Sequence, residues 1–183
     1  NSIEYIETLL DIWNCGDCAV LVDWRIPVST AHSMMTEAGI TKCYIDQRLF
    51  ESEDFGFDSK IEFQFYNRNT VCSTLLPQSI YNRFKSNYSN REAVIIYSSG
   101  TTGKSKGVIL SHKAIQMNAD AIYKYICPSP CEVFAIVKSL SHSSTLVGEL
   151  LVALKYRIPV VVFSERLFPG YVFKACGSFG VSI

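Results

Sequence analysis

The residues best suited to chemistry form one polar loop within the stretch VIIYSSGTTGKSKGVILSH, from Val94 to His112. The loop is built almost wholly of glycine, serine, threonine and lysine, and apolar runs flank it on both sides. Glycines bring the backbone close to a ligand and allow positive φ, hydroxyls donate hydrogen bonds, and lysines add positive charge. We therefore expect a phosphate-binding loop made of Ser98, Ser99, Gly100, Thr101, Thr102, Gly103, Lys104, Lys106 and Gly107.

The loop also matches part of the P-loop pattern G-x-x-x-x-G-K-[ST], through Gly103, Lys104 and Ser105. The first glycine of that pattern would fall at Ser98, and a strand pattern follows where a P-loop would begin a helix. The sequence therefore argues against a P-loop nucleoside triphosphatase. A Ser/Gly hairpin loop without a ligand is the other simple interpretation of this composition.

The whole segment resembles the phosphate-binding signature of the adenylate-forming enzymes, which include acyl-CoA synthetases, adenylation domains of peptide synthetases, and luciferases. Their pattern reads Tyr-[Thr/Ser]-Ser-Gly-[Ser/Thr]-Thr-Gly-x-Pro-Lys-Gly-Val, followed by a short strand and Ser-His. The chain matches it at residues 97–103, 106–108 and 111–112. Ser105 replaces the usual proline, which leaves the loop more flexible but keeps every hydrogen-bond donor.

A second segment, SLSHSSTLVGELLVALKYRIPVVV, resembles the family's later stretch Pro-Leu-x-His, which a buried helix and a strand follow. Ser139 replaces the proline, and His142 matches the histidine that lies beside the carboxylate pocket in the family. A capping or core role for His142 fits the sequence equally well. This segment favours acyl-CoA synthetases over amino-acid adenylation domains.

The resemblance implies an ATP-dependent, AMP-forming acid ligase. In that family a carboxylate attacks the α-phosphate of ATP, with Mg²⁺ as the metal, and the thiol of CoA or of a carrier-protein pantetheine then takes the acyl group. The loop would bind the β- and γ-phosphates, with Lys106 at the position of the family's lysine and Lys104 at a variable one.

Several functional segments of that family have no counterpart in residues 1–183. They are the Tyr-Gly-x-Thr-Glu segment, whose glutamate helps to hold Mg²⁺, the Thr-Gly-Asp segment that binds ribose, the hinge, and the C-terminal domain with its catalytic lysine. We therefore expect residues 1–183 to be a partial N-terminal AMP-binding domain that is inactive alone, with its main catalytic residue elsewhere. A stand-alone nucleotide- or phosphate-binding module, an amino-acid adenylation fragment and a purely structural domain are the alternatives.

The cysteines and the remaining histidine and serines suggest supporting roles. Seven cysteines, an odd number in mostly apolar contexts, favour reduced thiols in a cytoplasmic protein. The pairs at 15/18 and 127/131 could supply four thiolates to zinc, but they are far apart in sequence, and we expect no metal site. His112 is expected to support the start of a helix, and Ser141, Ser143 and Ser144 to form an N-cap cluster.

The elements that must position these residues alternate between helix and strand, which predicts an α/β fold with layered βαβ architecture and a mostly parallel sheet flanked by helices. Helices are expected at 3–14, ended by Gly16, after an N-cap at Ser29 and up to Gly39, after Pro77, after Ser111, at 144–154 and at 169–179. Strands are expected at 18–24, 42–46, 61–66, 93–97, 107–111, 132–137, 158–163 and from 180.

Composition limits the possible partners. The 17 basic and 17 acidic residues give no net charge, which argues against nucleic acid as a partner. No run approaches the length of about 20 apolar residues that a membrane helix needs. ATP, a small carboxylate, and CoA or an acyl carrier protein are the partners that the resemblance implies.

Overall fold

The structure is a computed structural model that describes residues 1–23, 25–47, 50, 60–66, 73–98, 106–164 and 168–182. Its helices are α1 (Ile3–Cys15), α2 (Val28–Glu37), α4 (Gln78–Arg83), α5 (His112–Ile126), η1 (Ser144–Leu151), α6 (Val152–Tyr156) and α7 (Pro169–Phe179). Its strands are β1 (Ala19–Leu21), β2 (Lys42–Asp46), β3 (Glu62–Tyr66), β4 (Ser73–Leu75), β5 (Glu92–Ser98), β6 (Lys106–Ser111), β7 (Phe134–Ile136) and β8 (Val160–Phe163).

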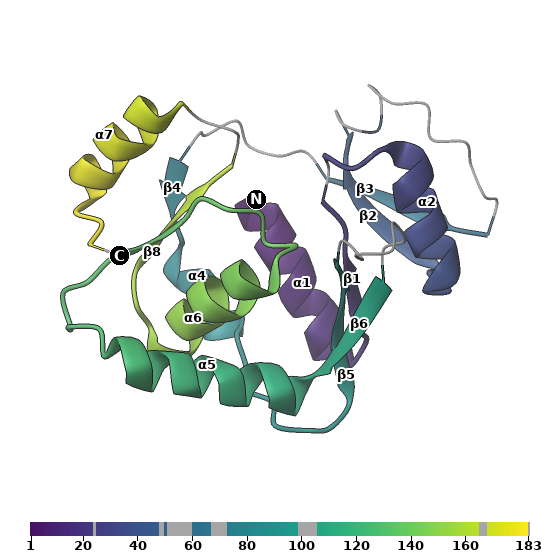
Figure 1. The fold of residues 1–183 in the computed structure, drawn as a ribbon, viewed down its shortest axis with the longest axis horizontal. Helices are drawn as coiled ribbons and strands as arrows, with labels where there is room; N and C mark the ends of the chain where they lie inside the picture. The colour runs from purple at the N-terminus through teal and green to yellow at the C-terminus, as the bar shows by residue number, and fades with distance from the viewer. Residues whose placement is uncertain are drawn as a thin grey trace.

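The strands form three small sheets, and most of the expected elements are confirmed (Figure 1). In the first sheet β5 pairs with β1 in parallel and with β6 in antiparallel orientation. The second sheet is the parallel pair of β2 and β3. In the third sheet β8 pairs in parallel with β7 and in antiparallel orientation with β4. The α/β class and the predominance of parallel pairs agree with the sequence prediction.

Helix α1 shows how local sequence sets the boundaries of an element. The Ser2 hydroxyl caps its start by accepting a hydrogen bond from the Tyr5 amide over 3.1 Å. Ile6, Leu9 and Leu10 are its buried residues and carry its apolar stripe into the core. Gly16, at φ 85°, ends the helix in the left-handed conformation that glycine adopts without strain.

The buried helix after residue 143 begins in a less common form. Residues Ser144–Leu151 form a π-helix, which continues as the α-helix α6. Its apolar side chains are nearly inaccessible to solvent, as the uniformly apolar sequence predicts; they are Leu146, Val147, Leu150, Leu151, Val152, Ala153 and Leu154. In Figure 1, α6 and α1 lie between the sheet of β4 and β8 and the sheet of β1, β5 and β6.

Two predicted details of the elements are wrong. Ser29 does not cap α2, because Pro27 occupies the N-cap position and its carbonyl accepts the Thr30 and Ala31 amides. No strand forms at residues 180–182, where Gly180 ends α7 at φ 66°. The chain there still reaches the sheet that contains β7, because the Ser182 amide donates to the Val133 carbonyl over 3.0 Å.

Within the described ranges, every helix is too short or too polar to traverse a lipid bilayer.

Candidate phosphate-binding site

The predicted phosphate loop, residues 98–107, is held by the antiparallel hairpin of β5 and β6. Tyr97 pairs with Gly107, and Ser98 pairs with Lys106, so the two ends of the loop are fixed beside each other. Residues 99–105 lie outside the described residues; they include the predicted site residues Ser99, Gly100, Thr101, Thr102, Gly103 and Lys104. The described structure therefore defines the frame of the loop through Ser98, Lys106 and Gly107.

Gly107 serves close packing, not the positive φ that the sequence suggested. The described glycines with positive φ are Gly16, Gly39 and Gly180, and Gly107 lies in the extended strand β6. A Cβ atom on Gly107 would lie 3.1 Å from Ile95 Cγ2 and 3.3 Å from Tyr97 Cζ. The absence of a side chain therefore lets the Tyr97 ring lie against the opposite strand at the neck of the loop.

Tyr97 fixes the neck of the loop to the neighbouring helix. Its hydroxyl donates a hydrogen bond to the Met34 carbonyl of α2 over 3.0 Å. Burial, together with the nearby Glu37 carboxylate, raises the pKa of Tyr97, so the hydroxyl stays protonated as a donor. Sequence reasoning included Tyr97 in the signature but gave no partner for it, because Met34 lies 63 residues away.

The described loop residues with anion-binding chemistry face solvent. Ser98 and Lys106 are both exposed, and the Ser98 hydroxyl donates to the Lys106 carbonyl at 3.5 Å. In the part of the chain that the structure describes, Lys106 forms no ion pair. Its ammonium group is therefore free, among these residues, to meet an anion at the end of the hairpin.

Helix α5 begins directly after β6, and its start is built as the sequence predicts. The Ser111 hydroxyl accepts a hydrogen bond from the Ala114 amide over 3.2 Å, which is an N-cap. His112 is 4% exposed, and its ring meets the Trp13 ring edge-on at 5.8 Å between centroids. Burial and the charge of Arg91 lower the pKa of His112, so this histidine is a neutral packing residue of the helix start.

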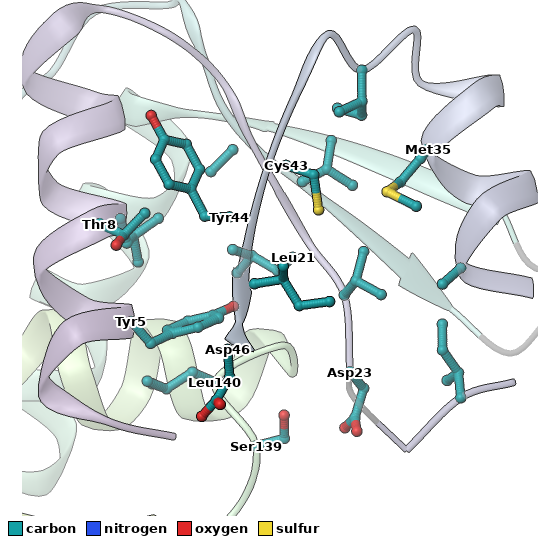
Figure 2. A pocket seen from close by; sticks show the side chains of 18 of the residues that line it. Tyr5, Thr8, Leu21, Asp23, Met35, Cys43, Tyr44, Asp46, Ser139 and Leu140 are labelled. Carbon is teal, nitrogen blue, oxygen red and sulfur yellow. The ribbon is translucent and has the colours of Figure 1, made fainter. Parts of the chain in front are cut away.

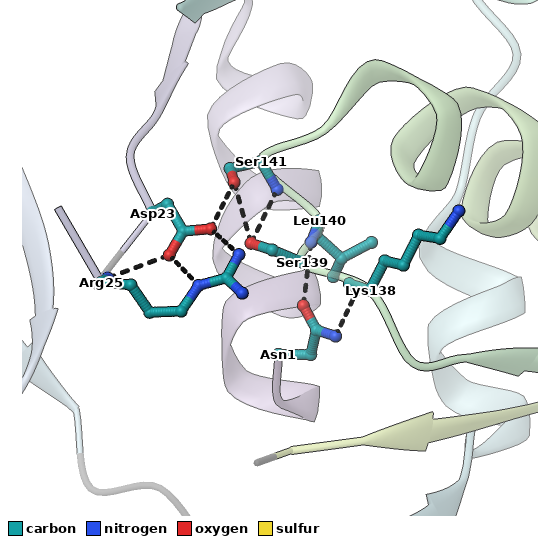
Figure 3. Close-up of polar contacts among 7 residues, drawn as sticks. All are labelled: Asn1, Asp23, Arg25, Lys138, Ser139, Leu140 and Ser141. Atoms are coloured by element: carbon teal, nitrogen blue, oxygen red, sulfur yellow. Dashed lines mark hydrogen bonds and ion pairs between the residues drawn. The ribbon is translucent and has the colours of Figure 1, made fainter. Parts of the chain in front are cut away.

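A polar cluster fixes the segment 138–142, which carries the second family resemblance (Figure 3). Asp23 accepts hydrogen bonds from Arg25 Nε over 2.8 Å and from the Ser141 hydroxyl over 3.3 Å. The Ser141 and Ser139 hydroxyls are 2.8 Å apart. The hydrogen bonds from Arg25 lower the pKa of Asp23 well below its usual range, against the opposing effect of burial.

Asn1 also holds the segment 138–142, through two hydrogen bonds to its backbone. Its Nδ2 donates to the Lys138 carbonyl over 2.8 Å, and its Oδ1 accepts from the Leu140 amide over 2.9 Å (Figure 3). The sequence prediction missed both this clamp and the Asp23–Ser141 contact, which joins residues 118 positions apart. The local sequence signal for this cluster is the spacing of Asp23 and Arg25, which lie two positions apart shortly after the strand β1.

His142 is an exposed residue, so the core role that the sequence left open for it is wrong. Its backbone is fixed in a turn, because its amide donates to the Ser139 carbonyl over 3.1 Å and its carbonyl accepts the Leu146 amide over 2.9 Å. The serine N-cap cluster is also wrong. Ser143 occupies the N-cap of η1 without a side-chain hydrogen bond, and Ser141 is engaged by Asp23.

Strand β1 connects the two candidate segments. It pairs with β5 through Leu21 and Ile96, one residue before Tyr97. Two residues after Leu21, Asp23 binds the hydroxyl of Ser141 next to His142. The loop neck and the His142 turn are therefore positioned by the same short strand.

Six of the seven cysteines lie within the described residues, and all six are free thiols. Among the described residues, no group of three or more His, Cys, Asp or Glu side chains could hold a metal ion. Cys15, Cys127 and Cys131 are exposed free thiols, and burial raises the pKa of the Cys18 thiol, which Glu92 raises further.

Comparisons with known proteins found similar sequences. A family model described as "AMP-binding enzyme" matches residues 1–183. The chain is 25% identical over 177 residues to a probable CoA ligase, CCL8, of Humulus lupulus, covering 87% of this chain and 28% of that protein. It is 29% identical over 117 residues to a plipastatin synthase polypeptide of Bacillus subtilis (strain 168), covering 62% of this chain and 3% of that protein.

Solved structures share the fold at low sequence identity. The o-succinylbenzoate CoA synthetase MenE from Bacillus subtilis, in complex with its acyl-adenylate intermediate, superposes with a TM-score of 0.75 at 17% identity, covering 100% of this chain and 46% of that one. ATP-bound MatB from Rhodopseudomonas palustris gives a TM-score of 0.74 at 18% identity, covering 97% and 36%. The chain thus spans less than half the length of these relatives.

Proposed function

Because this chain belongs to the AMP-binding enzyme family, we propose that it is part of an ATP-dependent acid–thiol ligase. In the first half-reaction a carboxylate oxygen bonds to the α-phosphorus of ATP, the bond to the bridging oxygen breaks, and pyrophosphate leaves. In the second, a thiol attacks the acyl carbon, AMP leaves, and the thiol proton passes to a base or solvent. The observation that supports this most is the hairpin that holds Ser98 beside Lys106 at the ends of the phosphate loop.

The proposed contribution of this chain is to hold the triphosphate. Charge neutralisation and positioning supply most of the catalysis in phosphoryl and nucleotidyl transfer. Lys106 is exposed at the first position of β6, where its charge can balance the β- and γ-phosphates that become pyrophosphate. The remaining donors of the loop, from Ser98 to Gly107, would add backbone and hydroxyl hydrogen bonds.

The described residues suit ATP better than they suit Mg²⁺. The exposed lysine and serine at the loop neck suit the phosphates of ATP. The described residues supply no group of acidic side chains for Mg²⁺, so the metal would be held by the phosphates and by groups elsewhere in the protein.

His142 is proposed to face the carboxylate substrate. Its side chain is exposed, while its backbone is fixed by the turn to Ser139 and Leu146. A rigid backbone with an exposed imidazole suits a group that orients a substrate. CoA is the proposed acceptor because CoA ligases and synthetases are among the relatives, and the plipastatin synthase relative supports a carrier-protein acceptor as the alternative.

A change at Lys106 in the complete protein tests the proposal. Lys106→Ala should lower the rate of carboxylate-dependent exchange between pyrophosphate and ATP by about 10²-fold, since a single preorganised contact to developing charge has this size of effect. Lys113→Ala is the matched control, because Lys113 is another exposed lysine, seven residues further along in α5. Equal exchange rates in the two variants would remove the role assigned to Lys106.

Thermal unfolding of the isolated chain distinguishes a ligase fragment from a stand-alone nucleotide-binding module. A free-standing nucleotide-binding module should show a rise in unfolding temperature with Mg-ATP, because a ligand that binds only the folded state stabilises it. A fragment that lacks the ribose and adenine contacts should show little or no shift. A large shift that persists in Lys106→Ala would favour nucleotide binding at a different place in the chain.

A further inference from the structure

The segment that leads into His142 has an apolar anchor and two polar neighbours. Leu140 is 1% exposed and packs in the hydrophobic core. Ser139 precedes it, and Asp23 lies close by, so that the three residues meet at one end of a cavity of about 970 Å³ (Figure 2). The core contact of Leu140 fixes the depth of the segment, but it leaves the conformation of the following turn to the polar groups.

A chain of hydrogen bonds connects Asp23 to the backbone of this turn. The Ser141 hydroxyl donates to Asp23 Oδ2 over 3.3 Å and lies 2.8 Å from the Ser139 hydroxyl. The Ser139 hydroxyl accepts the Ser141 amide over 3.3 Å, and the Ser139 carbonyl accepts the His142 amide over 3.1 Å. The bond to Asp23 therefore ties a set of local contacts to a residue 118 positions away.

The Asp23 carboxylate is itself held in one orientation. Arg25 Nε donates to Oδ1 over 2.8 Å, Arg25 Nη2 donates to Oδ2, and the Arg25 amide donates to Oδ1 over 2.9 Å. Two parallel contacts from a planar guanidinium fix the plane of a carboxylate. The Asp23 side chain is also only 13% exposed, which limits competition from water. Oδ2 is therefore a fixed acceptor for the Ser141 hydroxyl.

The residue type at position 139 makes this support necessary. The pattern that the segment resembles, Pro-Leu-x-His, has proline where this chain has Ser139. A proline ring holds φ at about −65°, whereas serine leaves this angle free to rotate in the absence of other contacts. In this chain the rigidity that the ring would give must come from hydrogen bonds, and those bonds end at Asp23.

We propose that Asp23 is a positioning residue of the ligase, which acts through the hydroxyl of Ser141 to fix the turn that presents His142 to the carboxylate substrate. This inference rests on the role proposed above for His142. Asp23 contacts neither the substrate nor ATP in this scheme. Its effect is to hold the His142 backbone in one conformation before the substrate binds, so that less order has to be imposed on binding.

Amide hydrogen exchange in the complete protein tests the structural step without substrate. Ser141→Ala removes the hydroxyl and leaves the Asp23 ion pair in place. Exchange of the His142 and Leu146 amides, whose hydrogen bonds close the turn, should become about tenfold faster. Ser143→Ala is the matched control, because Ser143 follows His142, is exposed and makes no capping bond. Equal exchange in Ser141→Ala and the unmodified protein would refute the proposal.

Kinetics of the complete enzyme test the effect on the reaction. In carboxylate-dependent exchange between pyrophosphate and ATP, Ser141→Ala should raise the KM for the carboxylate by about tenfold and leave the KM for ATP and the unfolding temperature unchanged. Asp23→Ala with Ser141→Ala should raise it no more than Asp23→Ala alone, because both changes remove one interaction. Equal increases in the two KM values with a lower unfolding temperature would indicate a general structural role and overturn the proposal. If Asp23→Ala does not fold, Ser141→Ala against Ser143→Ala decides the question.

His142→Ala separates this inference from the proposed function. This change should raise the KM for the carboxylate, and Ser141→Ala added to it should raise the KM no further. A wild-type KM in His142→Ala would remove the proposed role of His142, and the positioning role with it. A raised KM in His142→Ala together with a wild-type KM in Ser141→Ala would keep the proposed function and refute only the positioning by Asp23. Fully additive effects would refute it as well, since Ser141 would then act by a route other than His142.

Discussion

The hydroxyl of Tyr97 lies 3.0 Å from the carbonyl oxygen of Met34, and this hydrogen bond ties the strand that leads into the phosphate loop to helix α2. Met34 already accepts the Ala38 amide near the end of α2, so Tyr97 adds a second bond to the same oxygen. The neck of the loop is thus held by the β5–β6 pairing on one side and by a helix end on the other. The neck of the loop is therefore positioned by residues outside the loop itself.

Tyr97→Phe tests this anchor. The substitution removes one hydrogen bond and keeps the ring against Gly107, so it should lower the free energy of unfolding by about 0.5–1.5 kcal/mol. In the complete enzyme it should raise the KM for ATP while leaving the pH profile unchanged. Urea unfolding and steady-state kinetics measure the two effects, and wild-type stability together with wild-type KM would show that the anchor is irrelevant.

Gly107→Ala should damage the neck more strongly. Because an added Cβ would come within 3.1 Å of Ile95 and 3.3 Å of Tyr97, the hairpin must shift, at a cost of about 1–3 kcal/mol. Gly170→Ala is the control, because nothing lies within 4 Å of a Cβ there and Gly170 is in helix α7. Chemical denaturation should show a loss for the first variant and no loss for the second; equal stabilities would mean that β6 accommodates the methyl group.

Asp120 accepts hydrogen bonds from Tyr88, Lys155 and Tyr156, and this cluster makes the stability of the protein depend on pH. Burial of Asp120 opposes its ionisation, but hydrogen bonds from Lys155, Tyr156 and Tyr88 outweigh this effect and lower its pKa from 3.8 to about 2. A carboxylate with a lowered folded-state pKa contributes stability above its unfolded pKa, and this contribution is lost as the pH falls from about 4 toward 2. Asp120→Asn should therefore destabilise the protein at pH 7 by on the order of 1 kcal/mol, and by less at pH 3.

Asp11→Asn is the control for that measurement. Like Asp120, Asp11 pairs with a basic side chain, that of Arg83. The Asp11 side chain is 60% exposed, so the loss of unfolding free energy at pH 7 should be small. Thermal unfolding of both variants and of the unmodified protein at pH 7 and pH 3 gives the comparison. An Asp120→Asn defect that is equally large at both pH values would show that the cluster acts through packing and not through charge.

The sequence predicted what local rules determine. Ser111 caps α5 and Gly16 ends α1, because capping and left-handed termination involve residues a few positions apart. Serine is a common cap, so the sequence predicts Ser29 as the N-cap of α2, yet the helix begins two residues earlier and Pro27 is at the N-cap position. Propensity alone does not resolve a shift of two residues.

Long-range relationships were beyond the sequence. The contact of Asp23 with Ser141 and that of Tyr97 with Met34 connect positions 118 and 63 residues apart, and no periodicity carries that information. The resemblance placed Lys106 and His142 in functional segments but did not show the exposure of His142. The division of the described strands into three sheets was also not predictable, because strand patterns give the order of the strands in the chain and not their partners.

Two tyrosines provide the last prediction, because one hydroxyl has a partner and the other has none among the described residues. The Tyr81 hydroxyl donates to the Ile158 carbonyl over 2.8 Å in the core. The Tyr5 hydroxyl is buried without a partner in the described part of the chain, and burial, reinforced by Tyr66 and Asp23, raises its pKa so that it stays neutral. Removing a satisfied hydroxyl loses a hydrogen bond, whereas removing an unsatisfied one relieves a desolvation penalty.

Tyr81→Phe should therefore lower the free energy of unfolding by about 1–2 kcal/mol, and Tyr5→Phe should leave it unchanged or raise it by up to about 1 kcal/mol. Urea unfolding of the two variants under one condition measures the difference. A loss of stability in Tyr5→Phe would mean that the hydroxyl already has a partner in solution.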